Sequence, residues 1–136
     1  MKQLKLKPLA FSLAALAFSA GAGHAEMTVS FKWGGIPLCT TGKPNTVANP
    51  EFVLKGVPEG TNRLSFKLKD LDVPGYNHGG GTVKVKLSGA GKIPSGAFKY
   101  KSPCPPSGKH TYEWTVIAKN GGKTLATAKA RRKYPE

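Results

Sequence analysis

Apolar and polar residues alternate with a period of two in several separate segments of this 136-residue chain. A period of two is typical of β-strands that bury one face and expose the other. No segment after residue 25 shows the 3.6-residue period of an amphipathic helix over more than a turn or two. We therefore expect strands at residues 27–33, 51–55, 62–70, 82–87, 110–118 and 123–130.

Glycine and proline clusters separate these segments, and the chain contains 17 Gly and 11 Pro. The tripeptide Asn120-Gly121-Gly122 lies between two of the expected strands and predicts a tight β-hairpin. Short alternating strands divided by turn residues are typical of an all-β domain. The predicted fold is an antiparallel β-sandwich or barrel.

The first 25 residues have the pattern of a secretory signal peptide. Lys2, Lys5 and Lys7 precede an apolar stretch, and small residues stand at Gly23 and Ala25. We expect cleavage after Ala25, which also removes His24, and a single periplasmic or secreted domain over residues 26–136. An uncleaved N-terminal anchor is the alternative.

Cys39 and Cys104 both belong to this expected mature domain. Because two cysteines in an oxidising compartment favour a bond, we predict one disulfide between them. It would close a loop of about 65 residues and stabilise the fold by roughly 4 kcal/mol. The alternative is two buried free thiols.

The chain is strongly basic, with 21 Lys and Arg against 7 Asp and Glu and a formal charge of +14. Many of the lysines fall on the polar side of the expected strands. One interpretation is a solvated face that resists edge-to-edge pairing. The other is a functional surface that attracts anionic lipid headgroups or an acidic protein partner. We expect no specific recognition of nucleic acid.

The alternation of residues between the two faces of a strand places several potential binding groups on inward faces. Asp70 continues the inward face of its strand, and His110 and Tyr112 lie on the inward face of theirs. Strand ends meet at the ends of a sandwich, where ligands bind. His78 precedes three glycines, residues 79–81, whose amides could form an anion-binding nest. The plainer interpretation is that each histidine is a hydrogen-bonded core residue.

Enzyme and metal chemistry are less well supported. Asp70, Asp72, His78 and His110 could together ligate a divalent ion, but their spacing matches no specific template. Neither a nucleophile elbow nor a zinc-binding histidine pair at helical spacing is present in the sequence. We therefore expect no catalytic residue, no metal and no cofactor.

Two motifs carry a family resemblance. Residues 70–74 read Asp-Leu-Asp-Val-Pro, and residues 102–112 read Ser-Pro-Cys-Pro-Pro-Ser-Gly-Lys-His-Thr-Tyr. With His78 between them, they resemble the bacterial branch of the phosphatidylethanolamine-binding protein family. The resemblance implies a β-sandwich with an anion pocket at one end, here with the peripheral helices reduced or absent. The pocket residues that it implies are Asp70, His78, Cys104, Pro105, Pro106, His110 and Tyr112.

The sequence departs from the family pattern at Gly79, where the family has a tryptophan, and at Ser102, where it has a glycine. The resemblance nevertheless implies a function. We expect an exported, non-enzymatic binding protein for phosphate or a phospholipid-like headgroup. The alternative is an interaction or inhibitor protein that uses its basic surface to hold an acidic protein or an anionic membrane.

Overall fold

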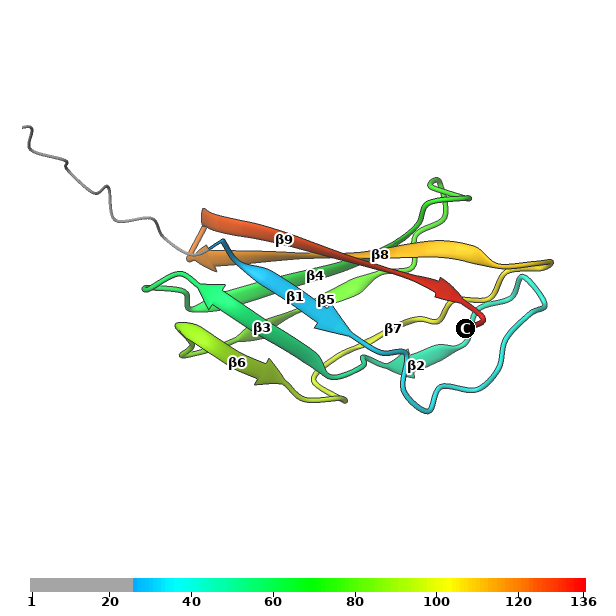
Figure 1. Ribbon diagram of the computed structural model, residues 1–136, viewed down its shortest axis with the longest axis horizontal. Coiled ribbons are helices and arrows are strands. Elements are labelled where there is room, and N and C mark those ends of the chain that lie inside the picture. The colour runs from blue at the N-terminus through cyan, green and yellow to red at the C-terminus, as the bar shows by residue number, and fades with distance from the viewer. Residues whose placement is uncertain (1–25) are drawn as a thin grey trace, which may run out of the picture.

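The structure is a computed structural model and describes residues 26–136 (Figure 1). The predicted signal peptide and its cleavage site lie outside these residues. The strands are β1 (Thr28–Phe31), β2 (Thr46–Ala48), β3 (Phe52–Val57), β4 (Arg63–Asp70), β5 (Gly80–Lys84), β6 (Gly89–Ile93), β7 (Lys99–Lys101), β8 (His110–Asn120) and β9 (Lys123–Tyr134). The described residues contain no helix, hence none long and apolar enough to span a membrane.

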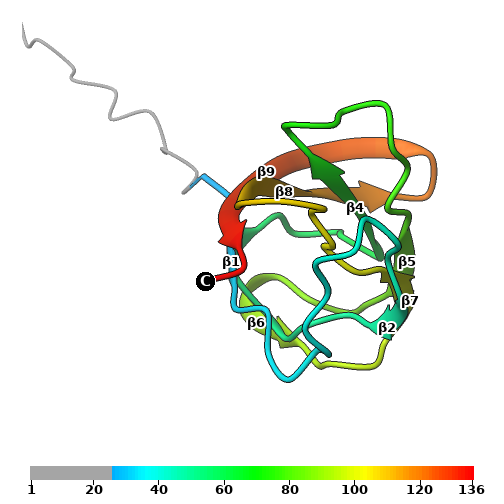
Figure 2. The ribbon, with the colours of Figure 1, turned by 90° about the vertical axis from the view of Figure 1, so that its right-hand side faces the viewer.

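All strand pairs are antiparallel, and the strands form two layers. One layer is the four-stranded sheet β5-β4-β8-β9, and the other combines the sheets β1-β3-β6 and β2-β7. Figure 2 looks along the layers from one end and shows β9, β8 and β4 on one side, with β6 and β2 on the other. The antiparallel β-sandwich predicted from the sequence is therefore confirmed.

Aromatic side chains from both layers fill the core. The Phe52 ring of β3 packs against Phe66 of β4, with ring centroids 4.7 Å apart. It also meets Trp114 of β8 edge-on at 5.2 Å. Phe66 and Trp114 lie on the same faces of their strands as Asp70 and Tyr112, which the period-two pattern assigned to the inward side. The alternation therefore predicts which side of each central strand is buried.

The predicted hairpin is also confirmed. Asn120 pairs with Lys123, and Gly121 and Gly122 form the two-residue turn between β8 and β9. Gly121 has a φ of +55°, which a side chain would disfavour. β9 runs to Tyr134 rather than to the expected residue 130, because β8 begins at His110 and pairs with β9 along this whole length.

The strands predicted at residues 27–33 and 82–87 also differ from the observed ranges. β1 stops at Phe31, and the chain turns at Gly34, which has a φ of +71°. Trp33 is nevertheless buried, and its indole Nε1 donates a hydrogen bond to the Lys133 carbonyl at 2.9 Å. The strand expected at residues 82–87 instead occupies Gly80–Lys84, where β4 supplies its hydrogen bonds.

Candidate functional site

A small pocket lies at the end of the sandwich where β4 finishes and β8 begins. Its volume is about 200 Å³. Each site residue predicted from the sequence lines it, namely Asp70, His78, Cys104, Pro105, Pro106, His110 and Tyr112. The antiparallel pairing of β4 with β8 explains why these residues lie together, because it places Asp70 directly opposite Tyr112. Two residues separate neighbouring inward positions, so His110 lies beside Tyr112 on the same face.

The Asp70 carboxylate is held by several donors. One oxygen, Oδ2, accepts a hydrogen bond from His110 Nδ1 at 2.7 Å. The other oxygen, Oδ1, accepts from the backbone amides of Asp72 at 2.9 Å and Val73 at 3.2 Å. Asp70 is only 4% exposed, so these bonds replace the water that it would otherwise bind. The carboxylate therefore fixes both the turn after β4 and the orientation of the His110 ring.

His78 is held by the backbone of β7. Its Nδ1 lies 2.8 Å from the Lys101 carbonyl oxygen, and the Lys101 amide donates to the His78 carbonyl at 2.8 Å. A carbonyl only accepts, so Nδ1 carries the proton and Nε2 is the nitrogen left for a ligand. Burial lowers the pKa of His78 below its ordinary value, although Lys101 and Asp70 oppose the shift. The imidazole is therefore neutral at pH 7.

The aromatic rings around His78 complete this side of the pocket. Tyr112 lies edge-on to the His78 ring with centroids 5.5 Å apart, and Tyr76 packs on it at 4.6 Å. Burial raises the pKa of the Tyr112 phenol strongly, and the charge of Asp70 raises it further. Tyr112 therefore keeps its proton and can donate a hydrogen bond.

The opposite wall is the proline segment, which a disulfide fastens to the loop between β1 and β2. Cys39 and Cys104 are bonded, as the sequence analysis predicted, with their Cα atoms 4.6 Å apart. The Thr41 amide donates to Cys104 Sγ at 3.3 Å, and the Cys39 amide donates to the Tyr134 hydroxyl at 3.0 Å. The loop after Cys39 is thereby held against the prolines.

Sequence reasoning missed four pocket residues, which are Gly42, Pro44, Val73 and Tyr76. Gly42 has a φ of +75°, and a Cβ there would approach Pro106 to 3.3 Å. Val73 belongs to the motif of residues 70–74, and the other three had no local signal beyond their proximity in sequence to Cys39 and to His78. Their placement depends on the disulfide and on the turn after β4, which alternation does not predict.

The glycine-nest prediction is wrong. Gly80 and Gly81 belong to β5 and pair with Lys67 and Phe66 of β4. A Cβ at Gly80 would lie 1.8 Å from the Phe66 carbonyl oxygen, and one at Gly81 would lie 2.5 Å from the Phe98 ring. These glycines therefore permit close packing of β5, and neither of them lines the pocket.

Three of the four possible metal ligands lie together. Single ligand atoms of Asp70, Asp72 and His110 are within 4.8 Å of one another. However, Asp72 Oδ2 accepts the Thr111 amide at 2.7 Å, and both Asp70 oxygens have the hydrogen bonds given above. His78 is not part of this group. The cluster serves as a hydrogen-bonded clamp between the turn after β4 and the start of β8.

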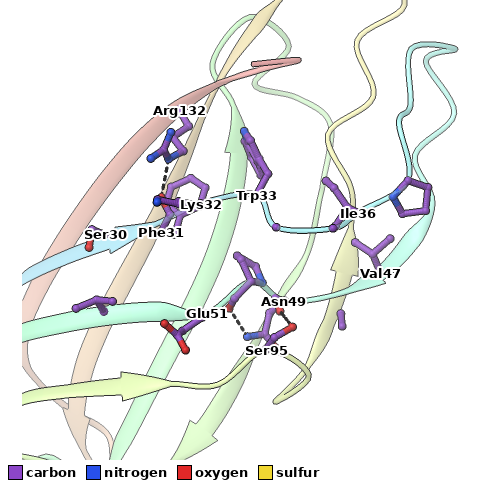
Figure 3. Close-up of a pocket in the computed structure, with 16 residues that line it drawn as sticks. Ser30, Phe31, Lys32, Trp33, Ile36, Val47, Asn49, Glu51, Ser95 and Arg132 are labelled. Carbon is purple, nitrogen blue, oxygen red and sulfur yellow. Dashed lines mark hydrogen bonds between the residues drawn. The ribbon is translucent and has the colours of Figure 1, made fainter.

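A second, wider concavity of about 880 Å³ lies elsewhere on the molecule (Figure 3). It is lined largely by apolar groups from the end of β1, the following loop and the segment from β2 to β3. Arg132 lies at its edge, donates to the Phe31 carbonyl and places its guanidinium carbon 5.9 Å from the centre of the Phe31 ring. No sequence pattern predicted this concavity, and it shares no residue with the small pocket.

Comparisons with known proteins agree with the fold and the motifs. The sequence model of the phosphatidylethanolamine-binding protein family matches residues 19–134. No curated protein matches the chain. Among solved structures, the homologue CT736 from Chlamydia trachomatis is 18% identical, with a TM-score of 0.58 over 82% of this chain and 98% of its own. Escherichia coli YbcL, described as a member of the mammalian family, is 20% identical, with a TM-score of 0.58 over 81% and 98%. The chain belongs to the phosphatidylethanolamine-binding protein family.

Proposed function

We propose that this protein binds phosphate, or a phosphate-bearing headgroup, in the small pocket and does not transform it chemically. The observation that carries the proposal is the convergence of His78, His110 and Tyr112 on one pocket beside the carboxylate of Asp70. Both imidazoles use Nδ1 for a fixed acceptor within the protein. Nε2 of each ring is therefore left for a ligand; it accepts a hydrogen bond from a ligand hydroxyl and donates to a ligand oxygen only when the ring is protonated, whereas the Tyr112 phenol supplies a donor.

The size of the pocket favours a small ligand group. A volume of about 200 Å³ is below the range of roughly 300–1,000 Å³ in which drug-sized ligands are held. A phosphate group with a short substituent suits such a space. The rigid proline wall and the disulfide keep the pocket formed before a ligand arrives, and this lowers the entropic cost of binding.

Several features favour binding over catalysis. The pocket lining contains no serine, threonine or free thiol among residues 26–136, because Cys104 is consumed by the disulfide. The Asp70–His110 pair resembles part of a catalytic triad, yet no nucleophile adjoins it in that lining. We infer that the Asp70 carboxylate fixes the orientation in which His110 Nε2 faces a bound ligand.

We further propose that the protein is exported to the periplasm or secreted. The pattern of residues 1–25 supports this, since a cationic start, an apolar stretch and small residues before the expected cleavage site form a signal peptide. The Cys39–Cys104 bond is consistent with an oxidising compartment. Sequencing the N-terminus of protein recovered from the periplasm or medium tests this, and an intact Met1 would contradict it.

Calorimetric titration with phosphate and phosphoethanolamine tests the pocket. We expect saturable binding that is lost in His78→Ala and in His110→Ala, with unchanged affinity in the matched control Lys92→Ala on the other sheet. Sulfate, whose charge is constant near neutrality, should bind more tightly as the pH falls, because protonated Nε2 becomes a donor. Equal affinity in all three variants would refute the proposed pocket.

A further inference from the structure

The outward side of the sheet β5-β4-β8-β9 is a strongly cationic face. Strand register places eight basic side chains on it, which are Arg63, Lys67, Lys69, Lys84, Lys119, Lys129, Arg131 and Lys133. The one carboxylate among these outward residues is Glu113, which is 5% exposed and is paired with Arg131 at 2.7 Å and Lys129 at 3.6 Å. We propose that this cationic face binds a linear acidic polysaccharide.

Like charges on this face are set directly opposite one another. Arg63 pairs with Lys84 on one side and with Lys119 on the other, so three cations lie in one row across β5, β4 and β8. Directly opposed like charges destabilise a sheet. Solubility alone does not require such a row, because scattered charges would serve equally well. A partner of opposite charge would compensate for the repulsion.

The other layer carries fewer cations. Its outward side has Lys32, Lys55 and Lys92 in and beside β1, β3 and β6, and Lys99 and Lys101 on β7; Lys92 lies 3.6 Å from Glu51. The strand register thus places eight outward cations on the four-stranded sheet and five on the other layer.

The cations flank a trough along β8. On one side are the basic residues of β4 and on the other those of β9, two strand spacings or roughly 9.5 Å apart. Between them, β8 presents Thr111 and Thr115, which are half-buried and have shorter side chains than the flanking cations, and Glu113, whose carboxylate is paired with Arg131 and Lys129. On β9 the cations Lys129, Arg131 and Lys133 recur every two residues, about 6.7 Å apart, whereas on β4 Ser65 separates Arg63 from Lys67 and Lys69. One extended polyanion with regularly spaced acidic groups would lie along this trough, over threonine hydroxyls that can bond to sugar hydroxyls.

Two other polyanionic partners fit less well. The outward residues of these four strands include no aromatic side chain on which nucleic-acid bases could stack. The large exposed apolar side chains of the described residues, Leu38, Val73 and Tyr76, lie on loops. The face therefore lacks the apolar anchors with which a surface-bound protein enters a membrane interface.

The test compares two triple variants of equal net charge. In Lys67→Gln/Lys69→Gln/Lys133→Gln, three cations from both sides of the trough are removed, and none of them has a carboxylate oxygen within 4 Å among residues 26–136. In the control, Lys32→Gln/Lys55→Gln/Lys92→Gln, three are removed from the other layer. Fluorescent dextran sulfate is the probe, and neutral dextran is its uncharged counterpart.

We expect dextran sulfate to bind, neutral dextran not to bind, and the trough variant to lose about tenfold in affinity. The control should lose less than about twofold. Equal losses in both variants would show that only net charge matters and would overturn the proposal. So would tighter binding of duplex DNA or of phosphatidylglycerol-containing vesicles than of dextran sulfate. If the triple variant unfolds more easily than the control, Lys67→Gln and Lys55→Gln replace them as a matched single pair.

Discussion

His110 Nδ1 and Asp70 Oδ2 lie 2.7 Å apart at the meeting point of two strand ends, so that a nearly buried carboxylate sets the orientation of the imidazole. The same carboxylate accepts the amides of Asp72 and Val73 through its other oxygen. It thus connects the turn after β4 to the first residue of β8. Changes at Asp70 should therefore affect both stability and ligand binding.

Asp70→Asn should lower the free energy of unfolding by about 1.5–3 kcal/mol, the usual contribution of a hydrogen bond to a charged group. The asparagine amide would also face His110 Nδ1–H with a donor, which would turn the imidazole away. The affinity for phosphate should fall as well, because the His110 imidazole would no longer be held in place. Asp72→Asn is the control, because Asp72 is exposed and, among residues 26–136, its carboxylate accepts just the Thr111 amide. Urea unfolding of the two variants makes the comparison, and an equal cost would contradict this account of Asp70.

Acidification should destabilise the protein through His78. Burial lowers its folded-state pKa below the ordinary value of 6.5, so the unfolded chain binds more protons just below that pH. Stability should therefore be complete above pH 6.5 and fall as the pH drops through the window below it. Urea unfolding at pH 7.5 and 5.5 measures the change. His78→Gln should flatten this dependence, and an unchanged slope in that variant would assign the effect to other groups.

Replacing Gly80 with alanine should be severely destabilising. Its Cβ would lie 1.8 Å from the Phe66 carbonyl oxygen, so β5 would have to separate from β4. We expect the free energy of unfolding to fall by about 3 kcal/mol or more, which is the upper end of the usual cost of overpacking a core. Gly75→Ala is the matched control, since it has no neighbour within 4 Å and no positive φ. If thermal unfolding shows that Gly80→Ala lowers stability no more than Gly75→Ala does, the assignment of Gly80 and Gly81 to β5 is contradicted.

Removing the disulfide should cost roughly 4 kcal/mol of stability and weaken the pocket. The bond joins two cysteines that are 65 residues apart in the sequence. The chain-entropy model gives roughly 4 kcal/mol for closing a loop of this length. The double variant Cys39→Ala/Cys104→Ala tests it by urea unfolding in parallel with phosphate titration. Because Gly42 and Pro44 line the pocket through this connection, unchanged phosphate affinity in a folded double variant would show that the loop is dispensable.

The sequence predicted those features that depend on side-chain period and missed those that depend on backbone contacts. Alternation placed Asp70, His110 and Tyr112 on inward faces, and the strand ladder then brought them together. It could not predict that Gly80 and Gly81 pair with β4, because glycines have no side chain to show a period. The strands β2, β6 and β7 were missed for similar reasons: β2 and β7 have only three residues each, too few for alternation to be seen, and two of the five residues of β6 are glycines.

Loop positions were the least predictable. Tyr76 packs on His78 from a turn with no strand pattern, and its location depends on the hydrogen bonds that Asp70 makes to the start of that turn. Trp33, by contrast, is buried on the same face as Phe31, as the alternation over residues 27–33 predicts, even though β1 ends before it and its indole donates to the Lys133 carbonyl of β9. The position of Tyr76 is set by tertiary contacts that the alternation does not show.

An amide NMR titration of the oxidised domain, residues 26–136, with phosphate at moderate salt tests the central claim most directly. The account predicts saturable shifts confined to the amides around Asp70, His78 and residues 104–112. It also predicts that these shifts disappear in His110→Ala while the remaining spectrum is preserved. Shifts spread over the lysines of the four-stranded sheet, weakening with salt and unaffected by His110→Ala, would contradict an anion pocket at this end of the sandwich.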